Sequence, residues 1–143
     1  MPLKNYLLPI LALLVLLVTA CSKKDANAGG NPVPQEAGLE VSLVNVTEGQ
    51  YTAAPGSTYT FQVKVTSDMP AQGVKITVTA ITDPGGVLIP QNLIAPSANG
   101  TIDVNLIGLE PIRTVKVTVV ITSVGKSNNT VTKEFWITNK AAE

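Results

Sequence analysis

The side chains of this chain that could do chemistry are a single thiol and a few scattered carboxylates. Cys21 is the only cysteine among 143 residues, and the sequence contains no histidine. Histidine is the commonest metal ligand and the usual acid or base near neutral pH. The chain also lacks a Gly-x-Ser-x-Gly elbow, which would present a serine nucleophile. We therefore expect no enzyme activity, no catalytic residues and no cofactor.

The carboxylates in or near predicted loops are Asp68, Asp83, Asp103 and Glu110. Calcium takes about six oxygen ligands, commonly from closely spaced acids. After residue 38 no two acids lie within three positions of each other. We expect solvated charges and no metal site. A glycosidase-type pair of carboxylates stays open, because such a pair forms in space rather than in sequence.

Cys21 follows an apolar segment with a basic residue, Lys4, near its start. The apolar run over residues 7–20 is 14 residues long, shorter than the roughly 20 that a membrane-spanning helix needs. A basic start, an apolar middle and small residues before a cut are typical of a secretory signal peptide. Residues 1–20 are therefore predicted to be a cleaved signal peptide, with the cut directly before the only thiol.

The residues Val18-Thr19-Ala20-Cys21 resemble the lipobox of bacterial lipoproteins. In that family a small residue precedes a cysteine whose thiol takes a diacylglycerol before cleavage. The next residues, Ser22-Lys23-Lys24-Asp25, resemble the start of Bacteroidetes-type lipoproteins, where a short charged stretch follows the lipidated cysteine. The resemblance implies lipid attachment at Cys21 and an outer-membrane location, on the periplasmic face or at the cell surface.

Residues 21–38 are predicted to be the lipidated cysteine and a flexible tether. The stretch from Ser22 to Ala37 is polar and rich in Gly, Pro and Asn, with no hydrophobic period. Ten basic residues balance ten acidic ones, and no basic patch stands out. This charge pattern argues against nucleic acid as a partner. The partners we expect are the membrane, through the lipid, and an unknown protein or glycan.

Residues 39–139 are predicted to fold as one domain, followed by a tail over residues 140–143. Apolar and polar residues alternate with period two in runs over residues 39–46, 58–66, 74–80, 101–106, 115–122 and 130–138, and residues 87–94 form a seventh, ambiguous run. The first run changes parity at Val44, which predicts a bulge or a crossing between sheets. Gly49 to Ser57 is expected to be a loop, and Pro90 marks its run as an edge strand or an irregular crossing. Seven runs without a helical period predict an all-β sandwich of two sheets.

The strand count and phasing of residues 39–139 resemble immunoglobulin-like or fibronectin-III-like domains of secreted bacterial proteins. The Cys…Trp…Cys pattern and the tyrosine corner of antibody domains are absent. Together with the lipobox resemblance at Cys21, this predicts an envelope lipoprotein whose domain has a non-catalytic role in binding or assembly.

Trp136 is the candidate ligand contact, with Tyr51 as its possible companion. Phe135 and Ile137 are predicted to face the core, so Trp136 should point outward, where it could stack on a sugar or anchor an interface. The competing interpretation is packing, or coverage by a loop at the rim. A carbohydrate-binding accessory lipoprotein of a sugar-uptake system should place Trp136 beside Tyr51 or another aromatic on an open face. A fimbrial subunit should show a missing strand and an apolar groove, and a generic adaptor should show neither.

Overall fold

The computed structural model describes residues 35–141, and this part of the chain forms eight strands and no helix. The strands are β1 (Val41–Val44), β2 (Tyr51–Ala54), β3 (Tyr59–Val65), β4 (Val74–Thr82), β5 (Leu88–Ile89), β6 (Thr101–Leu106), β7 (Thr114–Ser123) and β8 (Thr130–Asn139). The predicted all-β class is therefore confirmed. Cys21 and the predicted signal peptide lie outside the described residues.

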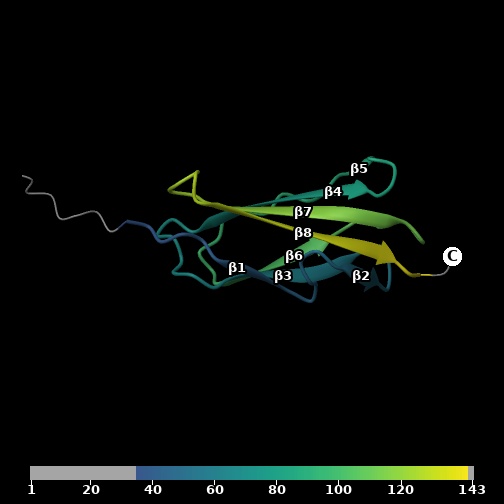
Figure 1. Ribbon diagram of the computed structural model, residues 1–143, viewed down its shortest axis with the longest axis horizontal. Coiled ribbons are helices and arrows are strands. Elements are labelled where there is room, and N and C mark those ends of the chain that lie inside the picture. Colours follow the sequence, from purple (N-terminus) through teal and green to yellow (C-terminus); the bar gives the residue numbers. More distant parts are fainter. Residues whose placement is uncertain (1–34, 142–143) are drawn as a thin grey trace, which may run out of the picture. The chain divides into compact units, whose positions relative to one another are not determined.

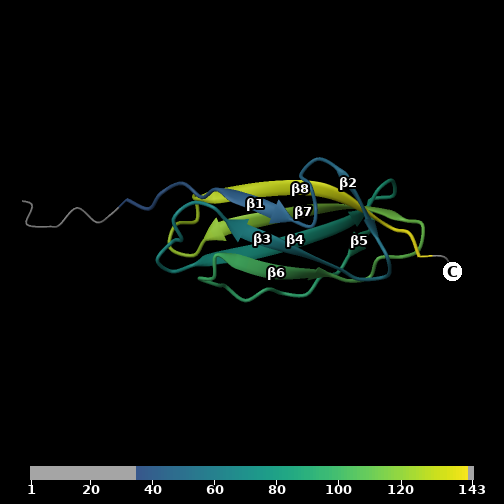
Figure 2. The ribbon, with the colours of Figure 1, turned by 90° about the horizontal axis from the view of Figure 1, so that it is seen from below.

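The strands form two sheets that lie face to face (Figures 1 and 2). One sheet has the order β1-β3-β6 and the other the order β2-β8-β7-β4-β5. Neighbouring strands are antiparallel, except that β2 runs parallel to β8. Apart from β2 and the two-residue β5, this division matches the immunoglobulin arrangement, which keeps strands A, B and E in one sheet and C, F and G in the other. The predicted two-sheet sandwich is confirmed.

The core forms because β-branched residues occupy alternate positions of the long strands. In β7, Val117, Val119 and Ile121 are fully buried, while the residues between them lie on the outer face. Phe61 of β3 and Phe135 of β8 meet edge to face between the sheets, with ring centroids 5.1 Å apart. This geometry is one that aromatic pairs favour. The burial confirms the strand phase predicted for β7 and β8.

The chain changes sheets early, between β1 and β2. Asn45 adopts a left-handed conformation (φ 68°) directly after β1, which asparagine tolerates better than most residues. Of the two explanations predicted for the parity change at Val44, a bulge or a crossing between sheets, the structure shows the crossing. The prediction of a loop from Gly49 to Ser57 was wrong, because β2 pairs there with β8. Only Ala54 of this four-residue strand is buried, so its sequence shows no alternation of apolar and polar residues that would indicate a strand.

The run over residues 87–94 forms only the two-residue strand β5 at the edge of the larger sheet. Pro90 follows it and has no N–H to continue the ladder. The predicted edge position is confirmed. The chain then crosses to the smaller sheet, where β6 begins, after Ser97 has bridged to Val74 at the start of β4.

Among the described residues, Glu36 is the first that is hydrogen-bonded to the sandwich, through residues at the turn between β7 and β8. Asn129 donates to the Glu36 carboxylate (2.6 Å) and accepts from the Leu39 N–H (2.8 Å), and Ser123 donates to the other carboxylate oxygen (3.0 Å). These hydrogen bonds, that from Asn129 above all, hold the pKa of Glu36 below its ordinary value. Residues 36–39 are therefore fixed to this end of the sandwich.

Candidate ligand-binding face

Trp136 lies on the outer face of the five-stranded sheet. Its neighbours in β8, Phe135 and Ile137, are fully buried, whereas Trp136 is only partly buried. The side chain therefore points outward, as the strand phase predicts. It is neither in the core nor freely solvated, so its contacts decide what it can do.

Tyr51 lies beside Trp136, since the two residues are direct partners in the parallel pairing of β2 with β8. Their ring centroids are 5.6 Å apart and their planes are inclined by only 31°. Tyr51 is 71% exposed and Trp136 is partly exposed, so the tyrosine ring of the pair opens to solvent. The sequence offered both residues as candidate contacts, and the structure brings them together through β2, the strand that the sequence did not reveal.

The indole of Trp136 is held in place by polar partners on neighbouring strands. Its Nε1–H donates to Oδ2 of Asp83 over 2.7 Å, and because Asp83 directly follows β4, the indole reaches across β7 to make this bond. Lys116 of β7 places its Nζ 5.7 Å from the ring centroid, within reach of a cation–π attraction. A side chain fixed in this way loses little rotamer freedom when a ligand binds.

Glu134, two residues before Trp136, completes the polar surroundings. Its carboxylate binds the Lys116 ammonium at 3.0 Å and accepts from the Thr118 hydroxyl at 3.0 Å. The hydrogen bond from Lys116, followed by that from Thr118, lowers the pKa of Glu134 from its ordinary value. The carboxylate is therefore charged near neutral pH, and it anchors Lys116 beside the indole.

The aromatic pair belongs to a row that crosses the whole sheet. Successive strand pairings align one outward residue from each strand, in the order Tyr51, Trp136, Lys116, Ile81 and Leu88. Leu88, at the far end of the row, is 62% exposed. The adjacent row holds Glu134, Thr118 and Thr79. A band with aromatic and apolar ends thus crosses a face that is otherwise rich in threonine.

The other candidate carboxylates do not gather into a site. Asp103 accepts from Gln62 over 2.8 Å, and Glu110 forms an exposed ion pair with Arg113. Within residues 35–141 no group of three or more Cys, Asp or Glu residues lies together. Asp83 was considered from sequence as a possible metal ligand or as one member of a carboxylate pair, and its bond to Trp136 was not foreseen. That partnership depends on strand register, which local periodicity does not contain.

Comparison with known proteins does not narrow the function. No family model, curated protein or solved structure matches the chain. Among the described residues, no helix has the length and apolar character needed to span a membrane. A function must therefore be inferred from the residues themselves.

Proposed function

We propose that this protein is a bacterial envelope lipoprotein, anchored in the outer membrane by a lipid on Cys21, whose sandwich binds a ligand without catalysis. The pattern Val18-Thr19-Ala20-Cys21 supports the anchor. The absence of histidine from the sequence supports a non-catalytic role, as do the separate partners of Asp103, which accepts from Gln62, and of Glu110, which pairs with Arg113. The fold supplies a rigid platform, because each long strand is packed on one face against the core.

Carbohydrate is the ligand class that the open aromatic pair favours, and this pair is the observation that carries the proposal. A sugar ring has an apolar face of C–H groups, which packs on aromatic rings, and hydroxyls around its edge, which need polar partners. Trp136 and Tyr51 offer adjacent aromatic rings, while Asp83, Lys116 and Glu134 surround the indole with both charges.

The aromatic pair lies well away from the point where the chain enters the sandwich. Strand β8 begins at Thr130, next to the residue that holds Glu36, and Trp136 is six residues further along. At about 3.3 Å per residue the separation is roughly 20 Å. If residues 21–38 act as the predicted tether, this separation keeps the aromatic pair clear of the lipid anchor.

The anchor is tested by metabolic labelling with palmitate in a bacterial host. The wild-type chain should take up label and remain with membranes, whereas Cys21→Ser should do neither, because two or more acyl chains anchor stably. Equal labelling of the two proteins would disprove the anchor.

The ligand class is tested on a glycan array with the full chain. Trp136→Ala should lose the glycans that the wild type binds, while Thr132→Ala, an exposed change on the same face of β8, should keep them. If the wild type binds no glycan, the carbohydrate proposal fails and the adaptor proposal takes its place. The fimbrial alternative ranks third, because a fimbrial subunit should lack a strand within a sheet, whereas among residues 35–141 both sheets run through neighbouring strands of this chain with no interior position vacant.

A further inference from the structure

Strand β6 is the outer strand of the smaller sheet, and its backbone groups alternate between the neighbouring strand and the open edge. The Val65 N–H donates to the Gly100 carbonyl. Because hydrogen-bonded pairs recur every second residue in an antiparallel ladder, Ile102 and Val104 also face β3. The N–H and C=O groups of Asp103 and Asn105 therefore point to the open edge. Within residues 35–141 no hydrogen bond uses these backbone groups.

At the next outward-facing residue of this edge, Ile107, the backbone groups are already bound by the side chain of Gln91. Oε1 of Gln91 accepts from the Ile107 N–H at 3.1 Å, and Nε2 of Gln91 donates to the Ile107 carbonyl at 3.1 Å. A carboxamide bound through both atoms reproduces one rung of a β-ladder. An amide group can therefore bind this edge through both its donor and its acceptor. The outward N–H and C=O groups of Asn105 and Asp103 are available for further bonds of the same kind.

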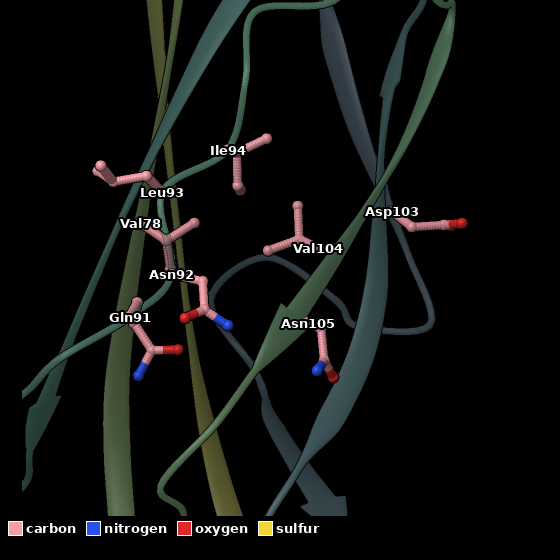
Figure 3. Close-up of a pocket in the computed structure, with 8 residues that line it drawn as sticks. All are labelled: Val78, Gln91, Asn92, Leu93, Ile94, Asp103, Val104 and Asn105. Carbon is pink, nitrogen blue, oxygen red and sulfur yellow. The ribbon is translucent and has the colours of Figure 1, made fainter.

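A hollow of about 270 Å³ lies beside these open backbone groups. Its floor is apolar, since Val78, Ile94 and Val104 point toward one another (Figure 3). The Asp103 side chain points away on the far side of β6, so this residue lines the hollow mainly through its backbone. An incoming strand would place every second side chain over the apolar floor.

We propose that the open edge of β6 binds an extended peptide segment of a partner protein, which adds a strand to the smaller sheet next to the Gln91 rung. Only a polypeptide backbone offers donors and acceptors at the repeat of Asp103 and Asn105, and the floor takes a small apolar side chain such as valine. Strand addition of this kind draws affinity from main-chain bonds and specificity from alternate side chains. The site is separate from Trp136 and does not depend on the carbohydrate proposal.

The test uses the full chain and a dye-labelled heptapeptide of alternating threonine and valine, followed by fluorescence anisotropy. Asn105→Pro removes the outward N–H, a change that edge strands tolerate, and Asn105→Ala is the matched control that keeps it. Asn105→Pro should weaken binding about tenfold, as the loss of one main-chain bond predicts, and Asn105→Ala should change it less than about twofold.

A second arm needs no variant of the protein. The same heptapeptide, N-methylated on every amide so that neither of its edges can donate, should not bind. The proposal is overturned if the methylated and unmethylated peptides bind equally, if Asn105→Pro and Asn105→Ala bind alike, or if the wild type binds neither peptide. Binding of an acetamido sugar in place of the peptide, with competition by free N-acetylglucosamine, would also overturn it.

Discussion

Two neighbouring residues of β8 should differ sharply in what they contribute to stability, because they lie on opposite faces of one strand. Phe135 is fully buried against Phe61, and its truncation to alanine removes a packed aromatic from the core. Such changes cost about 3–5 kcal/mol of the free energy of unfolding. The value should lie in the upper half of that range, because the edge-to-face pair is lost along with the buried area.

Trp136→Ala should cost less, although tryptophan is the larger side chain. The lost contacts are one hydrogen bond to Asp83, one aromatic neighbour and one cation–π contact. These are worth about 1, about 1 and about 0.5 kcal/mol at a partly exposed site. Asp83 itself is exposed, so its carboxylate regains water and no buried group is left unpaired. The expected loss is therefore about 2.5 kcal/mol.

The assay is urea unfolding of both variants followed by far-ultraviolet circular dichroism, since one variant lacks the only tryptophan. With an m-value of about 2 kcal/mol per molar urea, the midpoint should fall by about 1.3 M for Trp136→Ala and by about 2–2.5 M for Phe135→Ala. Equal falls would show that the indole is part of the core, and the idea of an exposed ligand face would be refuted.

Three further predictions concern other parts of the chain. Ile112 is 81% exposed and has a left-handed backbone (φ 59°). Because asparagine tolerates this conformation better than isoleucine, Ile112→Asn should raise the free energy of unfolding by about 1 kcal/mol, whereas Ile112→Ala, which keeps the strain, should not. Equal effects of the two changes would show that backbone strain is not the cause. Hydrogen bonds lower the pKa of Glu36 from its ordinary value of 4.5 in the folded chain, so its charge stabilises the fold above that pH and this contribution is lost on acidification. Glu36→Gln should therefore make Tm fall less steeply below about pH 5 than in the wild type. Parallel profiles of Tm against pH for the two proteins would count against the Glu36 contacts. Chelator should leave Tm unchanged, since no cluster of acids lies within residues 35–141, and a large drop would point to a metal that we do not propose.

Local periodicity was sufficient to predict the elements that bury a regular face. The alternating valines of β7 predicted both the strand and its core residues, and the same phase in β8 predicted that Trp136 points outward. Periodicity could not reveal β2, because Tyr51–Ala54 is held at the sheet edge by backbone bonds such as that from Lys140 N–H to the Ala54 carbonyl. Nor could it pair Trp136 with Asp83, which is 53 positions away. Contacts of that kind follow from strand order and register.

The proposed carbohydrate face is tested most directly by the emission of Trp136, the only tryptophan in the sequence. The full chain is titrated with the glycan that it binds best on the array, and with an unbound glycan as control. A saturable change in indole emission should appear with the bound glycan in the wild type and in Thr132→Ala. In Tyr51→Ala the affinity for the glycan should fall about tenfold, since the loss of one stacking ring is worth about 1.4 kcal/mol. Binding on the array with no change in Trp136 emission, or with unchanged affinity in Tyr51→Ala, would contradict the assignment of this face as the ligand site.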